Sequence, residues 1–174
     1  AQGSVICQTS IAEQGQGSES LAAQIVGSVL GVSMERVRVI LGDTDNTPYG
    51  GGTWASRGAG IGGEAALQAA KILRRNILDV AAAILQSSAA ELDIAGNAIV
   101  NAGDGSSRME LHELARIVYF RPDTLPPGIQ PELMATRHFV PREYPFAFTN
   151  GIQASWLEVD TDTGFIKLLK HWCV

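Results

Sequence analysis

The chain has 174 residues, of which 45% are hydrophobic and 18% are charged, and its formal net charge is −5 at pH 7. This length is enough for one domain with a sizeable core, and the mild acidity argues against a nucleic-acid binder, which normally carries a basic stripe. No apolar run reaches the roughly 18 residues of a membrane span, and the first residues lack the features of a signal peptide. We therefore expect a cytoplasmic globular protein.

The two cysteines, Cys7 and Cys173, lie in apolar alternating stretches. Such positions predict buried, reduced thiols rather than a disulfide. Two cysteines are also too few for an iron–sulfur cluster or a cysteine zinc site within this chain. Both ends of the sequence have strand character, whereas natural termini usually end in polar tails, so we expect a piece excised from a longer polypeptide.

The first elements predict a strand–helix–strand unit. The expected strand, helix and strand cover residues 5–11, 21–30 and 37–41. Apolar residues at helical spacing define the helix, Ser18 or Ser20 is a suitable N-cap, and Gly31 lies where a left-handed C-cap belongs. A parallel pairing of the two strands is plausible but not required.

A glycine-rich segment, residues 41–67, follows the second strand and leads into a helix. Glycine removes the side chain that keeps other groups away from the backbone, so a ligand or another segment can lie directly on peptide N–H groups. From Gly63 or Glu64, an alanine-rich pattern without internal Gly or Pro predicts a long helix to about Ser87.

The second half predicts short elements separated by turns. They are a hairpin of 91–94 and 98–101, a turn at 103–105, a helix over 111–118, an irregular stretch 121–132, a possible strand 135–140, a loop 141–145, and a hairpin of 151–160 and 165–174. We therefore expect an α+β (mixed α/β) fold with a strand–helix–strand unit, a long central helix and a C-terminal antiparallel hairpin. The fragment 1–174 would divide into a glycine-loop and helix half, 1–90, and a hairpin-rich half, 91–174.

Residues 58–63 match G-x-G-x-x-G, the pattern of dinucleotide-binding turns. That interpretation needs a strand directly before the glycines and an acidic residue at the end of the next strand. The next two acidic residues after Glu64 are Asp79 and Glu91, and Asp79 lies inside the helical pattern. Binding of a nicotinamide dinucleotide is therefore a weak alternative.

Four acids flank the glycine segments: Glu13, Asp43, Asp45 and Glu64. They could form a set of general bases. We favour structural roles, in which the two aspartates organise turns and Glu64 complements the positive end of the long helix. His112, His138 and His171 are far apart in the sequence, which favours surface or packing roles over metal binding.

Several motifs in order carry a family resemblance. They are QGQGSESL (14–21), VRVILGDTD (37–45), GTWASR (52–57), GGEA (62–65) and EVDTDTG (158–164). Their order and spacing resemble the molybdenum-cofactor large subunit of the xanthine dehydrogenase, aldehyde oxidase and carbon monoxide dehydrogenase family. The resemblance covers nearly the whole chain, from about residue 3.

The resemblance implies a molybdenum hydroxylase that oxidises an aldehyde, an N-heterocycle or carbon monoxide with oxygen derived from water. Molybdenum is held there by the dithiolene of a pyranopterin, molybdopterin, often extended by cytosine dinucleotide, which would explain the lack of protein metal ligands. The implied partners are the remainder of the parent chain, iron–sulfur and FAD subunits and a small-molecule substrate, without nucleic acid or a membrane span.

The resemblance also implies roles for individual residues. The cofactor would contact Gly15, Gln16 and Gly17 near the metal, and its pterin or phosphates would face Ser56 and Arg57. The substrate pocket beside molybdenum would contain Trp54 and Ala55. Gln16 would act through its amide, and a guanidinium suits a pterin phosphate. Trp54 could instead be a packed core residue, and Arg57 could be a structural ion-pair residue.

The family's G-G-x-F-G segment and its catalytic glutamate are not found in this sequence. We therefore expect no catalytic residue in this fragment and no turnover by this chain alone. The alternative is a non-catalytic α/β domain whose glycines serve only packing and subunit docking.

Overall fold

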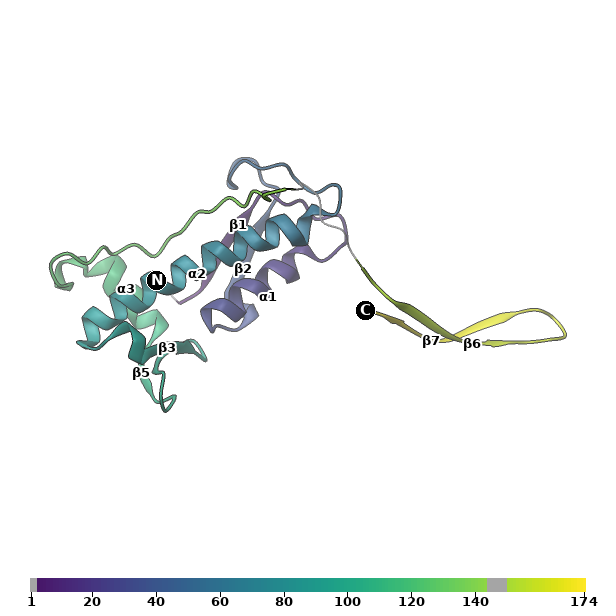
Figure 1. The fold of residues 1–174 in the computed structure, drawn as a ribbon. Coiled ribbons are helices and arrows are strands. Elements are labelled where there is room, and N and C mark those ends of the chain that lie inside the picture. Colours follow the sequence, from purple (N-terminus) through teal and green to yellow (C-terminus); the bar gives the residue numbers. More distant parts are fainter. Residues whose placement is uncertain (1–2, 144–149) are drawn as a thin grey trace.

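The computed structural model describes residues 3–143 and 150–174 (Figure 1). Its regular elements in chain order are β1 (Val5–Thr9), α1 (Ser18–Leu30), η1 (Met34–Arg36), β2 (Val37–Leu41), η2 (Gly58–Gly62), α2 (Gly63–Leu85), η3 (Ala89–Glu91), β3 (Leu92–Ala95), β4 (Ala98–Asn101), β5 (Ser107–Glu110), α3 (Leu111–Phe120), η4 (Pro122–Thr124), β6 (Gln153–Val159) and β7 (Ile166–Cys173). The mixed α+β class and the C-terminal hairpin are confirmed.

The strand–helix–strand unit is confirmed, and its strands pair in parallel. The register runs from Val5 opposite Val37 to Thr9 opposite Leu41. Helix α1 contacts both strands and lies beside α2 (Figure 1). Because parallel strands end at the same edge of a sheet, the loops that follow β1 and β2 begin side by side.

The two ends of α1 differ in how well the sequence predicted them. Gly31 forms the expected C-cap at φ 63°, with its N–H donating to the Gly27 carbonyl. The predicted N-cap is wrong, because Gly17 occupies that position at φ 79° without a side-chain bond, while Ser18 is the first helical residue and is buried.

Helix α2 begins at Gly63, as predicted, and ends at Leu85. Its buried face includes Ala70, Ile77, Val80 and Ala81, which belong to the main core. A single π turn, Gly58–Gly62, runs straight into this helix. Because β2 ends at Leu41, the G-x-G-x-x-G run does not follow a strand directly, and the geometry of a dinucleotide turn is absent from this described segment.

A three-stranded antiparallel sheet of order β3-β4-β5 packs with α3 at the far end of α2. The side chains of Ile99 and Leu114 are fully buried there and join the same core as Leu30 and Val80. Strand β5 was missed by the sequence analysis, since Met109 is its one apolar residue. The predicted hairpin of β3 and β4 is confirmed.

An ion pair between Arg74 on α2 and Asp93 on β3 joins the helix to this sheet. Both side chains are part-exposed, so we expect Arg74→Met to lower the free energy of unfolding by only about 0.2–1 kcal/mol. Urea unfolding followed by circular dichroism measures this difference. The matched control is Arg75→Met at the exposed neighbouring position, and an equal loss in both variants would show that the pair adds nothing.

Residues 125–143 form an irregular segment that runs back over α2 (Figure 1). The Asn76 side chain donates to the Glu132 carbonyl at 3.4 Å and helps to hold it. The predicted strand 135–140 is wrong, because no described strand lies beside it to complete a ladder. The end of the predicted loop 141–145 lies outside the described residues.

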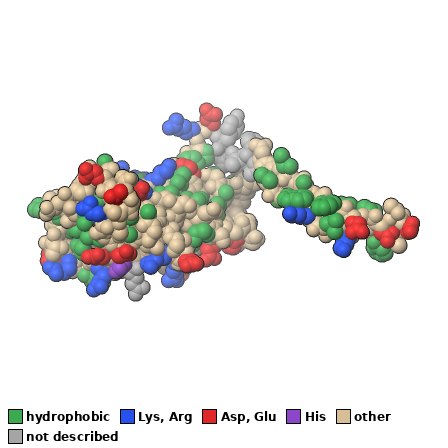
Figure 2. Space-filling model, turned by 90° about the horizontal axis from the view of Figure 1, so that it is seen from below, with side chains coloured by type: hydrophobic (Ala, Val, Ile, Leu, Met, Phe, Trp, Pro, Cys, Tyr) green, Lys and Arg blue, Asp and Glu red, His purple; other side chains and the backbone are tan. Residues whose placement is uncertain are grey.

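The β6–β7 hairpin projects from the body of the molecule (Figure 1), and hydrophobic side chains lie along it (Figure 2). All of its strand residues are exposed, including Trp156 and Trp172. Cys173 is therefore exposed, and the prediction that it is buried is wrong. Cys7 is part-buried, and this burial raises the pKa of its thiol. None of the helices formed by described residues is long and apolar enough to cross a membrane.

Candidate functional site

The two glycine loops that follow β1 and β2 are bound to each other through Thr53. The Ala12 N–H donates to Thr53 Oγ1 at 2.8 Å, and this hydroxyl donates to the Ala12 carbonyl at 2.7 Å. The Gln14 side-chain amide adds a bond to the Thr53 carbonyl at 3.4 Å. The structure therefore brings the GQG turn (residues 15–17) and the GTWASR loop (residues 52–57), far apart in sequence, into one site.

The GQG turn is folded around the carboxylate of Glu13. Gly15 and Gly17 donate their N–H groups to Oε1 at 2.9 and 3.0 Å, and Glu19 donates its N–H to Oε2 at 3.2 Å. These donors include the first free N–H groups of α1, which a capping side chain normally satisfies. Glu13 thus performs the capping that the sequence analysis assigned to a serine.

The Gln16 amide is used mainly inside its own turn. Its Nε2 donates to the Ala12 carbonyl at 3.1 Å and to Ser18 Oγ at 3.0 Å, and its Oε1 accepts the Gln14 N–H at 2.6 Å. A side-chain amide has two N–H donors and two acceptor lone pairs. One lone pair on Oε1 is therefore left to meet a ligand.

The GTWASR loop presents an aromatic ring and a guanidinium together. Trp54 Nε1 donates to the Gly51 carbonyl at 2.8 Å, and Arg57 lies 5.4 Å from the Trp54 ring centroid, within cation–π range. A Cβ at Gly51 would overlap Arg57 Nη1, so the guanidinium lies directly against the backbone there and would have to move aside for a larger residue. Trp54 is 55% exposed, which excludes the core interpretation of this residue.

Ala55 and Ser56 adopt left-handed backbone conformations, at φ 51° and 56°. Non-glycine residues rarely adopt this region, and such strain concentrates at functional sites. Both side chains are exposed. The loop thus holds the Ser56 hydroxyl and the methyl group of Ala55 at the surface, beside Trp54 and Arg57.

Three glycines of the site leave the backbone exposed, with open space where a side chain would stand. Gly15, Gly17 and Gly52 have φ of 96°, 79° and 69°, and nothing lies within 4 Å of where a Cβ would stand. A flat ligand can therefore approach the backbone closely. The open backbone fits a pyranopterin ring, and the exposed hydroxyl and the guanidinium are donors that fit its phosphate.

The acidic residues beside the glycine loops have structural contacts. Asp43 accepts the Asn46 side-chain amide at 2.6 Å and the Asp45 N–H at 3.0 Å, and these bonds, the Asn46 bond first, hold the pKa of Asp43 below its ordinary value. Glu64 lies in the first turn of α2 and accepts the Gln68 amide at 3.0 Å. The turn role is confirmed for Asp43, whereas the helix-end role of Glu64 stays a prediction, because the π turn Gly58–Gly62 continues the helix before it. Across the described part of the chain, no cluster of His, Cys, Asp or Glu could hold a metal ion.

The pKa of Glu13 predicts how acid affects the turn. Desolvation raises this pKa, but backbone N–H groups of the turn and of α1 outweigh it and hold the pKa below its ordinary value. A lowered folded-state pKa means that the stabilisation is complete above the unfolded pKa of about 4.3 and is lost as the pH falls through the folded pKa. We expect the difference in Tm between the wild type and Glu13→Gln to be constant from pH 7 to about 5 and to shrink below about pH 4. Thermal unfolding followed by circular dichroism tests this, and a difference that persists to pH 3 would contradict it.

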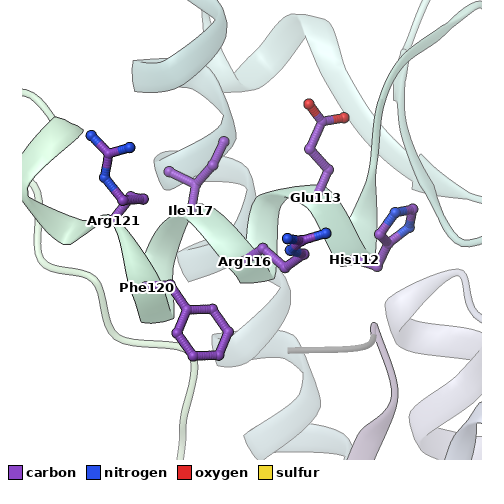
Figure 3. A pocket seen from close by; sticks show the side chains of 6 residues that line it. All are labelled: His112, Glu113, Arg116, Ile117, Phe120 and Arg121. Carbon is purple, nitrogen blue, oxygen red and sulfur yellow. The ribbon is translucent and has the colours of Figure 1, made fainter.

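A separate hollow lies along α3 (Figure 3), a helix at the other end of α2 from the glycine loops (Figure 1). It is lined by His112, Glu113, Arg116, Ile117, Phe120 and Arg121. These side chains come from one helix and the residue after it, and they fan outward (Figure 3). None of the residues that the family resemblance implies lies in this hollow.

Two residues of the site were missed by the sequence analysis in their actual roles. Thr53 was included in the GTWASR motif but given no role, and its partner Ala12 is 41 residues away. Glu13 was weighed only as a base, although an acid just before a glycine turn and a helix start is a recognisable capping signal. The implied cofactor contacts and the implied substrate pocket remain predictions for all seven residues: Gly15, Gln16, Gly17, Ser56 and Arg57 for the cofactor, and Trp54 and Ala55 for the pocket.

The sequence model of the family described as "Molybdopterin cofactor-binding domain" matches residues 1–174. The chain is 33% identical to the nicotine 6-hydroxylase large subunit of Paenarthrobacter nicotinovorans and 30% identical to the carbon monoxide dehydrogenase large chain of Hydrogenophaga pseudoflava, over 99% of this chain and 21% of each relative. The crystal structure of quinoline 2-oxidoreductase from Pseudomonas putida 86 matches with a TM-score of 0.78 and 34% identity, over 99% of this chain and 22% of that one. The chain thus spans about a fifth of the length of these proteins.

Proposed function

Because the chain belongs to the molybdopterin cofactor-binding domain family, we propose that its two glycine loops hold part of a molybdopterin cofactor with molybdenum in a larger oxidoreductase. The observation that carries this proposal is the bond pair between Thr53 and Ala12, which unites the GQG turn with the GTWASR loop. The two loops expose backbone without covering side chains at one site, and together they form a surface on which an extended cofactor can lie.

The roles of the residues follow from their contacts. Gly15 and Gly17 leave room for the pterin beside the backbone, and Gln16 offers its remaining Oε1 lone pair to an N–H of the ring. On the facing loop, the Ser56 hydroxyl and the Arg57 guanidinium bind the phosphate. Arg57 contributes more to phosphate binding than Ser56 does, because a charge-assisted hydrogen bond is about twice as strong as a neutral one.

The bound cofactor supplies the redox chemistry, the oxidation of a substrate with oxygen derived from water. The chain positions the cofactor and shapes access to it. Trp54 and Ala55 form part of the substrate pocket, where the exposed indole provides an apolar wall and the small Ala55 leaves space beside it. The substrate is an aldehyde, an N-heterocycle or carbon monoxide.

The working enzyme contains more than this chain. The chain covers about a fifth of its relatives, one of which is named as subunit gamma of a dehydrogenase complex. We propose that the remainder of the parent polypeptide completes the site, that iron–sulfur and FAD subunits carry electrons away, and that the cofactor is the cytosine dinucleotide form. On this view the assembly is cytoplasmic, and the isolated chain does not turn over substrate.

The test uses the complete polypeptide that contains this chain, with Arg57→Ala and, as the matched control, Arg38→Ala at an exposed position on β2. Losing charge-assisted hydrogen bonds of about 1.5–3 kcal/mol should weaken cofactor retention about 10- to 100-fold in the first variant only. Molybdenum is measured by elemental analysis and pterin by fluorescence after oxidation. Equal cofactor content in the wild type and both variants would overturn the role of Arg57.

A second candidate function is a non-catalytic α/β domain that serves packing and subunit docking. The observation in its favour is that the Gln16 amide already makes three hydrogen bonds within its own turn. This alternative expects Gln16→Ala and Arg57→Ala to leave both cofactor content and activity of the complete polypeptide unchanged. The same measurements therefore separate the two candidates.

A further inference from the structure

The GQG turn and the start of α1 form a concave group of backbone N–H donors, at Gly15, Gly17 and Glu19, which we call the amide cup. All three donate to a single carboxylate, that of Glu13, at 2.9 to 3.2 Å. Successive backbone N–H groups at a helix start carry partial positive charge and normally attract phosphate or other anions. In this protein the anion is supplied by the chain itself.

The residues at this helix start offer no cap of their own. Gly17, at the N-cap position, has no side chain to accept a bond, and Ser18 is buried, with its hydroxyl accepting from Gln16. The carboxylate of Glu13 is bonded through both of its oxygens, so it fixes the conformation of the turn as well as its charge. Four backbone N–H groups lower the pKa of Glu13 despite its desolvation, which keeps it ionised at neutral pH.

The facing loop has the opposite charge. Arg57 lies four residues after Thr53, and Thr53 is bonded to Ala12, the residue before Glu13. One side of the site is therefore acidic and the other basic. A phosphate at the amide cup would meet the Glu13 carboxylate as a like charge, whereas a phosphate at Arg57 would meet a guanidinium.

We infer that Glu13 is a positioning residue, a built-in anion that fills the amide cup so that the GQG turn meets a part of the cofactor other than its phosphate, and the phosphate lies at Ser56 and Arg57. This inference rests on the proposed function, because it assigns the two ends of the cofactor to the two loops. It predicts that emptying the cup creates an anion site that the wild type lacks.

The experiment uses the complete polypeptide prepared without its cofactor, with inorganic phosphate as the probe. Isothermal titration at constant ionic strength, set with chloride, compares the wild type with Glu13→Ala and with the isosteric Glu13→Gln. Glu19→Gln is the matched control, because it removes the same charge while leaving the three bonds to Glu13 in place. Circular dichroism shows which variants are folded.

We expect Glu13→Ala to bind phosphate at least about tenfold more tightly than the wild type and the Glu19→Gln control. In preparations loaded with cofactor, we expect Glu13→Gln to retain less molybdenum and pterin than Glu19→Gln. If Glu13→Ala does not fold, the phosphate comparison is made with Glu13→Gln, which should show a smaller gain of the same sign. Phosphate affinities equal to that of the wild type in the folded variants would overturn the inference.

The experiments distinguish a failure of the proposed function from a failure of the inference about Glu13. A wild-type polypeptide without molybdenum and pterin would refute the cofactor, while the phosphate titration would still report whether Glu13 fills an anion site. A wild type that contains the cofactor, with Glu13 variants that retain it fully and gain no phosphate binding, would leave the proposed function intact and remove the role of Glu13.

Discussion

Replacing Gly31 by alanine is expected to lower the free energy of unfolding by about 2–5 kcal/mol, from left-handed backbone strain of about 1–2 kcal/mol and overpacking of about 1–3 kcal/mol. Gly31 has a φ of 63°, and a Cβ there would overlap the Ile94 carbonyl of β3. The Gly31 carbonyl also accepts the Asn97 N–H at 3.3 Å, so the end of α1 and the β3–β4 hairpin cannot separate without breaking this bond. Chemical unfolding followed by circular dichroism measures the loss.

Gly96→Ala is the matched control for Gly31→Ala. Gly96 has a similar φ of 57°, but nothing lies within 4 Å of its Cβ position. This control should show only the backbone strain of about 1–2 kcal/mol. Equal losses in the two variants would contradict the close approach of β3 to the end of α1.

Replacing Thr53 by valine in the complete polypeptide is expected to weaken cofactor retention about tenfold or more. Valine keeps the shape of threonine but removes the hydroxyl that accepts from the Ala12 N–H and donates to its carbonyl. Losing both bonds costs about 1–3 kcal/mol. The GQG turn and the GTWASR loop would then no longer be held at a fixed distance from each other. Molybdenum and pterin contents report the retention, and the Tm reports the stability.

The control for Thr53→Val is Thr47→Val, which removes a hydroxyl bonded at 2.6 Å to the Asp43 carbonyl within a single turn. This variant should lose stability without a comparable loss of cofactor. Thr53→Ser, which keeps the hydroxyl, should restore most of the retention. If Thr47→Val and Thr53→Val lost cofactor equally, the bridge between the loops would not be what positions the cofactor.

The elements that the sequence predicted correctly are those whose signals are local. Helix α2 follows from an alanine-rich pattern without internal breakers, and the β3–β4 hairpin follows from the turn at residues 95–97. Strand β5 has little apolar pattern and exists because β4 lies beside it. Residues 135–140 have suitable side chains but no described neighbouring strand, so the prediction failed. Strand formation depends on a partner that local sequence does not contain.

The site also depends on contacts between distant residues, which local sequence does not contain. The glycine loops were visible as motifs, but the bond from Thr53 to Ala12 joins residues 41 apart and follows only from the parallel pairing of β1 and β2. The N-cap of α1 was assigned to a serine because serine is one of the preferred N-cap residues. The structure uses Glu13 instead, since a left-handed Gly17 turns the chain so that a more distant carboxylate reaches the N–H groups.

The molybdenum and pterin content of the complete wild-type polypeptide, purified from a host able to assemble the cofactor, is the most direct test. We expect close to one molybdenum and one pterin per chain. A well-folded protein from the same host that contains neither would contradict the assignment of the two glycine loops to a molybdopterin cofactor and would favour the docking domain.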